Sequence, residues 1–391
     1  MRIAFYAPMK PADHPVPSGD REIARLLIQA LGTAGHSVEI ASRFSSRDGS
    51  GDPVRQARLR DLGCRTAERL IRRYRARPAY ERPDAWITYH VYHKSPDWLG
   101  PAIADAFAIP YLIVEASSAP KRAGGPWDIG YSGANAAIRR ADAVLTLNSD
   151  DAACLKPVMS DSAWHRHLPP FVDTSRFAAL AEFRTTIRAG FAQRCHWNPD
   201  IPWLLAVGMM RGGDKQASYE VLAKAIFELA DEPWHLLVVG DGPQRAGIVH
   251  QLTAAAPGRV AFLGELSNED LALVYTASDM LVWPAINEAF GMALLEAQAA
   301  GRPVVAGNQR GVPDIVSPGV TGLLPPAGDA GAFAEAVRRL LQDDEMRHAF
   351  STAAARHARE KFDLAGAAHE IGRAIDLACL HAGNRAIPGA A

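Results

Sequence analysis

The sequence has few cysteines, almost no net charge and no long hydrophobic run. Its four cysteines show neither paired nor metal-ligand spacing, so we expect a reduced compartment and no disulfide framework. The 42 basic and 43 acidic residues give a net charge of -1, which removes any whole-molecule electrostatic case for nucleic-acid binding. No stretch approaches the roughly 18 consecutive apolar residues that a membrane span needs, and only a short apolar run precedes Pro8. We therefore expect a cytoplasmic protein.

The length of 391 residues predicts two domains, each able to bury its own core. Short apolar runs alternate with longer amphipathic segments, which is typical of an α/β fold with parallel sheets. The strands expected in the first half are 3–6, 38–41, 85–89, 111–114 and 143–147. Those expected in the second half are 203–207, 235–239, 260–263, 280–283 and 303–306. Between the two sets, Pro169 and Pro170 forbid a helix, and we expect the hinge within residues 167–177.

Residues 54–82 are rich in arginine, with apolar residues at helical spacing, and predict a basic amphipathic helix. Such a helix can rest on anionic lipid, where each basic residue contributes on the order of 1 kcal/mol. The alternative is an ordinary solvated helix face, partly neutralised by Asp61 and Glu68. Peripheral membrane contact through this segment and the absence of any such contact both stay open.

Residues 283–307, WPAINEAFGMALLEAQAAGRPVVAG, follow an expected strand and contain the most informative pattern. Pro284 ends the strand, and the Ala-, Leu- and Met-rich run before Gly301 predicts a helix that starts near residue 290. The free amides of a helix start form a natural seat for a diphosphate. Glu288 and Glu296 are eight residues apart, so a helix reaching back to Glu288 would place both on roughly one face. A carboxylate accepts paired hydrogen bonds from vicinal hydroxyls, so one of these two glutamates can hold a ribose and the other a sugar ring. The alternative is that both are ordinary acidic residues of a helix with no ligand.

The order Glu-Ala-Phe-Gly-Met-x-x-x-Glu, followed by Ala-Gly-x-Pro-Val-Val, closely resembles the donor-site signature of the retaining GT-B glycosyltransferases of family 4. The resemblance covers most of residues 170–345 and implies two Rossmann-like domains facing each other across a cleft. It assigns Glu288 to the transferred sugar and Glu296 to the nucleotide ribose. The backbone expected around the phosphates is that of Ala289, Phe290, Gly291 and Met292.

Further segments of the second half follow the order of that family. Residues 207–226 resemble the segment that supplies an Arg and a Lys to the donor diphosphate, which assigns these roles to Arg211 and Lys215. Two cations there would stabilise the charge of the leaving group in place of a metal; solvated surface charges in a glycine-containing loop are the alternative. The family usually has Arg directly after the strand-end glycine, where this chain has Met209. The strand-and-turn segment LLVVGDGPQ and the loop expected to meet the nucleobase supply the remaining donor-site candidates, Gly242, Glu265 and Leu266.

The first half resembles the family more loosely, as expected for the part that binds the acceptor. Gly19 is the candidate for a glycine that approaches the donor phosphate; a loop glycine before a helix capped by Ser18 or Asp20 is the alternative. His90 follows an expected strand, at the edge where open α/β sheets bind ligands, and can donate to a sugar hydroxyl or an acceptor oxygen. Glu115 stands where several family members have a histidine near the reacting sugar. It is a candidate general base or acceptor ligand, and a carboxylate that caps the following turn is the alternative.

The resemblance implies transfer of a hexosyl-type sugar from a UDP- or GDP-sugar to a glycan, lipid-linked or small-molecule acceptor, with retention and with no metal or other cofactor. It also implies an acceptor-binding domain at residues 1–170, a donor-binding domain at 171–360, and a helix at 361–391 that crosses back to the first domain. Two rivals stay open. One is a sugar-nucleotide epimerase on the same fold, and the other is a noncatalytic protein that binds a sugar nucleotide.

Overall fold

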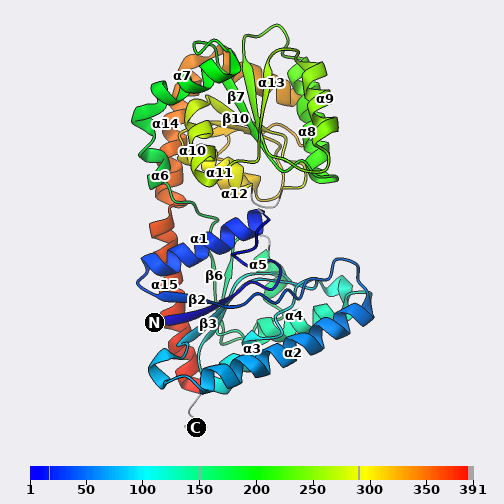
Figure 1. Ribbon diagram of the computed structural model, residues 1–391, viewed down its shortest axis with the longest axis vertical. Helices are drawn as coiled ribbons and strands as arrows, with labels where there is room; N and C mark the ends of the chain where they lie inside the picture. Colours follow the sequence, from blue (N-terminus) through cyan, green and yellow to red (C-terminus); the bar gives the residue numbers. More distant parts are fainter. Residues whose placement is uncertain (17, 149–150, 289–290, 386–391) are drawn as a thin grey trace. The chain divides into compact units, whose positions relative to one another are not determined.

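The computed structural model describes residues 1–391 except 17, 149–150, 289–290 and 386–391 (Figure 1). The described residues form two compact units: Met1–Pro169 together with helix α15 (Leu364–Arg385), and Pro170–Asp363. The first division falls between two consecutive prolines, which cannot continue a helix. The acceptor- and donor-binding roles that the sequence assigns to these two parts stay predictions.

The first unit, in its described residues, contains a parallel sheet in the order β2-β1-β3-β4-β5-β6. Burial of apolar side chains explains most of these strands, because those of β3, β4 and β5 are almost fully buried. The strands are β1 (Arg2–Tyr6), β2 (Ser37–Ser42), β3 (Ala85–Val91), β4 (Tyr111–Ala116), β5 (Ala143–Thr146) and β6 (Trp164–His167).

Helices cover both faces of this sheet (Figure 1). On one face α1 (Gly19–Thr33) packs against α15, which also contacts β4, β5 and β6. On the other face α2 (Pro53–Arg75), α3 (Gly100–Phe107) and α4 (Asp128–Arg140) pack against one another. The short helix α5 (Asp151–Leu155) follows β5.

Helix α2 is the arginine-rich helix that the sequence predicts, but it ends at Arg75 rather than near residue 82. Pro78 follows closely, and the chain then forms a short 3-10 turn at Ala79–Glu81. The buried face of α2 is small and includes Gly63, Ala67 and Leu70, while most of its arginines are exposed. No described helix is both long and apolar enough to cross a bilayer. Contact of α2 with a membrane surface stays a prediction.

The second unit, in its described residues, contains a parallel sheet in the order β12-β11-β10-β7-β8-β9. Its strands are β7 (Trp203–Val207), β8 (His235–Val239), β9 (Val260–Gly264), β10 (Met280–Trp283), β11 (Val304–Ala306) and β12 (Gly322–Leu323). Helices α8 (Asp214–Phe227), α9 (Arg245–Ala255) and α13 (Ala330–Gln342) form one packed group. Helices α7 (Arg184–Cys195), α10 (Asn268–Ala277), α11 (Met292–Ala299) and α14 (Asp344–Lys361) form the other. Short helices α6 (Ser175–Ala178) and α12 (Val312–Ile315) and 3-10 turns at Pro120–Arg122 and Ala181–Phe183 complete the described elements.

The α/β prediction is confirmed, and each of the ten strands expected from the sequence is present. The structure adds β6 and β12, which the sequence did not predict. Three of the four residues of β6 are exposed, because it is an edge strand of polar sequence. β12 has only two residues, so neither strand has the buried apolar run on which the prediction depended.

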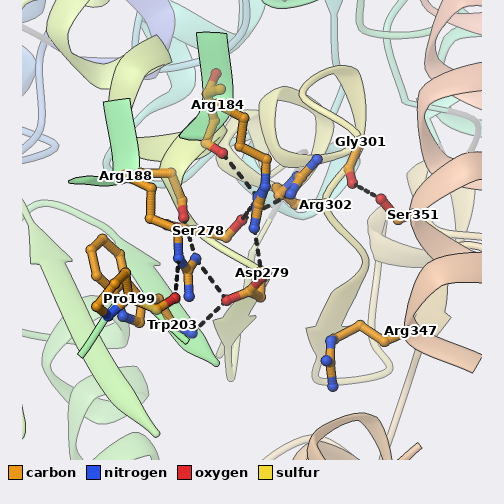
Figure 2. A network of polar contacts seen from close by, with 12 residues as sticks. Arg184, Arg188, Pro199, Trp203, Ser278, Asp279, Gly301, Arg302, Arg347 and Ser351 are labelled. Carbon is orange, nitrogen blue, oxygen red and sulfur yellow. Dashed lines mark hydrogen bonds and ion pairs between the residues drawn. The ribbon is translucent and has the colours of Figure 1, made fainter. Parts of the chain in front are cut away.

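A network of charged groups fixes the amino ends of two central strands in the second unit (Figure 2). Asp279, directly before β10, accepts hydrogen bonds from Arg184 Nη2 at 2.6 Å and Arg188 Nη1 at 2.9 Å. Its Oδ2 also accepts from the backbone N–H of Trp203, the first residue of β7, at 2.7 Å. One carboxylate therefore ties the neighbouring strands β7 and β10 to helix α7. At the opposite, carboxyl ends of β7 and β10, the chain leads to Lys215 and Glu288.

We predict that Asp279→Ala lowers the free energy of unfolding of the second unit by about 3 kcal/mol. The substitution leaves Arg184 and Arg188 without their carboxylate and one buried backbone N–H without an acceptor. Urea denaturation of the full chain, followed by circular dichroism, measures the loss. Asp231→Ala is the matched control, since that side chain is 75% exposed, and it should change stability by less than about 0.5 kcal/mol. Equal stability of the two variants would show that the network does not hold the strands.

Candidate functional site

The loop after β10 brings Glu288 to the first turn of α8. Lys215 Nζ forms an ion pair with Glu288 Oε2, and Trp283 Nε1 donates to the same oxygen at 3.3 Å. The ammonium group of Lys215 also lies 5.2 Å from the centre of the Trp283 ring. About a fifth of each charged side chain is exposed. The pair is therefore open to solvent and to a ligand.

Two further bonds fix the backbone of this loop against α8. The N–H of Ile286 donates to Ser218 Oγ at 3.0 Å, and the side-chain amide of Asn287 donates to Asp214 Oδ2 at 2.8 Å. Ala285 and Asn287 have positive φ angles of 57° and 53°, which cost energy for residues other than glycine and persist only where surrounding contacts enforce them. The position of Glu288 thus depends on a tightly held turn.

Helix α11 begins at Met292, two residues later than the sequence predicts. Its N-cap is Gly291 with φ +68°, where a side chain would lie 2.7 Å from Leu294, so this reversal of the chain requires glycine. Glu288 lies before the helix, so the condition under which it would share one helical face with Glu296 is not met. Two members of the predicted motif, Ala289 and Phe290, lie outside the described residues.

Glu296 lies on α11 and is 7% exposed. Its Oε2 lies 2.9 Å from the hydroxyl of Tyr275, and its Oε1 lies 3.8 Å from Arg176 Nη2. Burial and the charge of Glu296 raise the pKa of Tyr275 well above its usual value, so the hydroxyl stays protonated and donates. No described contact joins Glu296 directly to Glu288, and the two carboxylates have separate sets of partners.

The other donor-site candidates lie at the same edge of the sheet but are not in contact with Glu288. Arg211 is exposed, and no described contact joins its side chain to Lys215. Gly242 has φ +151°, and a side chain there would lie 2.4 Å from the carbonyl oxygen of Met210, so this glycine is needed for packing of the loops. Glu265 is exposed after β9, and Leu266 packs against the core of the unit.

In the first unit, His90 and Glu115 lie at the carboxyl ends of neighbouring strands β3 and β4. Both have the left-handed conformation, with φ of 66° and 63°. Such angles inside a strand turn the side chains out of the regular alternation of the strand. They bring His90 Nε2 within 3.9 Å of Glu115 Oε1. Strained backbone at two facing positions is a frequent mark of a functional site.

Asp20, on the first turn of α1, completes this cluster. His90 Nδ1 donates to Asp20 Oδ1 at 3.0 Å. Burial alone would lower the pKa of His90, but Glu115 and Asp20, with a smaller contribution from Asp151, raise it to about 9. Burial works against the charge of Asp20, yet the hydrogen bond from His90 lowers the pKa of that carboxyl. Burial raises the pKa of Glu115, and its Oε2 is buried without a hydrogen-bond partner.

The sequence named Asp20 only as a possible cap of α1, and the structure gives that role to Ser18, whose Oγ accepts from Arg21 N–H at 3.2 Å. Gly19 is the first residue of α1, and a side chain there would meet nothing within 4 Å. The fold itself therefore does not require this glycine. Sequence reasoning also missed Asp214, Ser218, Trp283, Tyr275 and Arg176. Of these, Trp283 had a signal, because it ends an expected strand at the ligand-binding edge of the sheet.

Part of the chain is similar in sequence to known glycosyltransferases. Residues 207–357 match the family model described as "Glycosyl transferases group 1". The chain is 35% identical over 161 residues to D-inositol 3-phosphate glycosyltransferase of Corynebacterium efficiens, which is 39% of this chain and 38% of the relative. It is 31% identical over 213 residues to 2-deoxystreptamine glucosyltransferase of Streptomyces kanamyceticus, which is 53% of each protein. The matched part thus spans only about two fifths to one half of these curated relatives.

Solved structures match nearly the whole chain. Sucrose-phosphate synthase from Thermosynechococcus elongatus has a TM-score of 0.70 at 24% identity and covers 95% of this chain and 97% of its own. Anabaena HepE, in complex with UDP-glucose, has a TM-score of 0.67 at 17% identity and covers 96% and 99%. The fold is GT-B. At these identities the likeness establishes the GT-B fold alone. Among the described residues, no group of three His, Cys, Asp or Glu side chains is arranged to hold a metal ion.

We predict that His90 titrates near pH 9, because two carboxylates stabilise its cation. Asp20→Asn or Glu115→Gln should lower that pKa by about 1 to 3 pH units. Since the folded-state pKa lies above the unfolded value of about 6.5, the contribution of His90 to stability is complete below about pH 6.5 and is lost as pH rises through 9. Heteronuclear NMR of the imidazole nitrogens measures the titration. Glu22→Gln, also on α1, is the control and should leave the curve unchanged; a wild-type His90 that titrates near pH 6.5 would contradict the prediction.

Proposed function

We propose that this protein is a glycosyltransferase that moves a sugar from a nucleotide-sugar donor to a hydroxyl of an acceptor. The observation that carries the proposal is the Lys215–Glu288 pair, held on the loop between β10 and α11. It lies inside the segment that matches glycosyl transferases group 1. A cation for a diphosphate and a carboxylate for sugar hydroxyls are the two groups that recognition of an activated sugar requires.

In this proposal Lys215 binds the donor diphosphate and Glu288 binds hydroxyls of the transferred sugar. The bond between the anomeric carbon and the phosphate oxygen breaks, and the electron pair leaves with the nucleoside diphosphate. Lys215, with Arg211 as a second cation, stabilises the negative charge that develops there. A new bond forms between the anomeric carbon and the acceptor oxygen, and the acceptor proton passes to an oxygen of the departing diphosphate. We propose retention at the anomeric carbon and no requirement for a metal, as the resemblance of the donor motif implies.

We assign Glu296 to the ribose hydroxyls of the donor. Tyr275 and Arg176 hold this carboxylate in one orientation, which suits bidentate recognition of a vicinal diol. The UDP and UDP-glucose complexes of Anabaena HepE, which has the same fold, make UDP-sugars the first donors to test. GDP-sugars form the second arm of the same panel.

On the acceptor side, we propose that His90, Asp20 and Glu115 bind the acceptor hydroxyl or the transferred sugar. Their position at the carboxyl ends of β3 and β4 is the edge where open α/β sheets bind ligands. Among the described residues, no group meets the geometry of a hydrogen bond to the buried Oε2 of Glu115, which can accept one from a substrate hydroxyl.

We predict that wild-type protein binds a UDP- or GDP-sugar and that Glu288→Ala lowers kcat/KM by about 100-fold or more. Glu296→Ala should weaken binding of the nucleoside diphosphate itself by about tenfold or more, because it removes a charged acceptor of two hydrogen bonds. Calorimetry with a panel of nucleotides and nucleotide sugars measures binding. An assay for release of the nucleoside diphosphate, run with extracts that supply candidate acceptors, measures kcat/KM.

Glu360→Ala is the matched control, since Glu360 is exposed on α14 and should leave binding and release unchanged. Folded Glu288→Ala and Glu296→Ala proteins that bind and process every donor as wild type would refute the proposal. Binding of a nucleotide sugar with no release of the diphosphate in any extract would identify the protein as a noncatalytic sugar-nucleotide-binding protein instead.

A further inference from the structure

A second group of side chains at the carboxyl edge of the first sheet surrounds Trp127, and neither the sequence motifs nor the proposed reaction uses it. Arg122, after β4, places its guanidinium carbon 4.8 Å from the centre of the indole ring. Lys94, after β3, places its ammonium nitrogen 5.4 Å from that ring centre. His93 meets the same ring edge-on, at 5.9 Å and an interplanar angle of 87°. We call His93, Lys94, Arg122 and Trp127 the Trp127 cluster.

Four nitrogen atoms of the Trp127 cluster are buried without a hydrogen-bond partner: both ring nitrogens of His93, Nε of Arg122 and Nε1 of Trp127. Buried polar atoms in proteins almost always have a partner, so four unpaired nitrogens in one place require an explanation. Arg122 Nε and Trp127 Nε1 are donors only, and a neutral imidazole donates from one of its nitrogens. Three of these four nitrogens are therefore N–H donors, and the second ring nitrogen of neutral His93 is an acceptor.

The cluster also carries positive charge that the protein does not neutralise. In the part of the chain that the structure describes, no carboxylate lies within ion-pair distance of Lys94, Lys121 or Arg122. Burial, and then the positive charges of Arg122, Lys94 and Lys121, lower the pKa of His93 to about 4. His93 is therefore neutral at physiological pH, and the local potential is positive without it.

Ring contacts connect the Trp127 cluster to the candidate acceptor site. The rings of His90 and Tyr92 are stacked at 4.9 Å, and Tyr92 meets His93 edge-on at 5.3 Å. His93 in turn contacts Trp127. The Trp127 cluster is thus linked to His90 by a continuous row of aromatic contacts, through Tyr92 and His93.

We propose that the Trp127 cluster is a binding subsite for an oxyanion, most simply a phosphate group, on the acceptor of the reaction. The inference rests on the proposed function, since it takes the ligand to be the acceptor. Arg122 and Lys94 supply the charge, and Arg122 Nε and Trp127 Nε1 supply N–H donors once the arginine side chain turns from the ring toward the anion. The acceptor would then carry its phosphate at one end and the attacking hydroxyl near His90.

The observations favour a small anionic ligand over a membrane surface. A lipid surface attracts basic residues spread over an exposed face, whereas Arg122 and Lys94 converge on one indole ring. The unpaired nitrogens are buried. A flat lipid surface would not reach them and would leave them without hydrogen-bond partners.

The test is calorimetric titration with inorganic phosphate at low ionic strength, performed on full-length protein with and without saturating UDP. UDP occupies the proposed donor site, so the phosphate measured in its presence binds elsewhere. We expect wild-type protein to bind phosphate in both conditions and the double variant Lys94→Ala/Arg122→Ala to bind it at least tenfold more weakly. Trp127→Phe, which keeps an aromatic face and removes Nε1–H, should give a smaller loss, and Arg122→Lys should restore part of the affinity lost in Arg122→Ala.

Arg139→Ala is the matched control, because Arg139 is an exposed arginine in the last turn of α4 and should leave phosphate binding unchanged. Phosphate affinity that is equal in wild type and the folded double variant would overturn the inference. Binding of phosphatidylglycerol vesicles but not of free phosphate, lost in the double variant, would overturn it in favour of a membrane surface. Failure of every nucleotide to bind would instead contradict the proposed function, and the titration without UDP would still test the Trp127 cluster.

Discussion

Parallel strands impose the constraint on which the rest of this structure depends: all strands of one sheet end at the same edge. In the first unit this edge gathers Asp20 from the helix after β1, His90 from β3 and Glu115 from β4. In the second unit it gathers Lys215 from the helix after β7 and Glu288 from the loop after β10. Residues up to 73 positions apart thus meet without any local sequence relation. The chemistry of each unit is decided by what its loops place at this edge.

The charges at the two edges are held in different ways. Lys215 and Glu288 form a single ion pair, and about a fifth of each side chain is exposed. A diphosphate that reaches Lys215 would offer its ammonium group another negatively charged partner in place of the carboxylate. The Asp279 network at the opposite edge is different, because it fixes strand ends with three short bonds to one carboxylate. Strand ends that are fixed in this way help to hold the binding residues of the sheet in one geometry.

The sequence predicted the strands well because burial dictates them. β7, β8 and β10 have the predicted bounds, and nearly all their residues are buried. From the order of its motifs, the sequence also assigned ligand contacts to particular segments, and that assignment stays a prediction. The sequence placed the start of α11 two residues too early. The observed start depends on the left-handed conformation of Gly291 and on its close approach to Leu294 and Glu288, and these contacts are visible only in the folded chain. The bond between His90 and Asp20 spans 70 residues, and a contact of that separation leaves no local pattern in one sequence.

Glu115 stands where the resemblance to family 4 leads us to expect a histidine, and its charge bears directly on what His90 can do. A second imidazole at this position would not stabilise the cation of His90, whereas Glu115 and Asp20 together raise its pKa to about 9. An imidazole that is protonated at neutral pH donates hydrogen bonds from both nitrogens and cannot accept a proton. With a pKa of about 9, His90 is a poor general base at neutral pH and is suited to hold an oxygen atom or a negative charge. In the proposed function, the carboxylate of Glu115, whose Oε2 has no hydrogen-bond partner by geometry among the described residues, accepts a hydrogen bond or a proton from a substrate hydroxyl. This proposal separates positioning by a cation from proton acceptance by a carboxylate on two neighbouring strand ends.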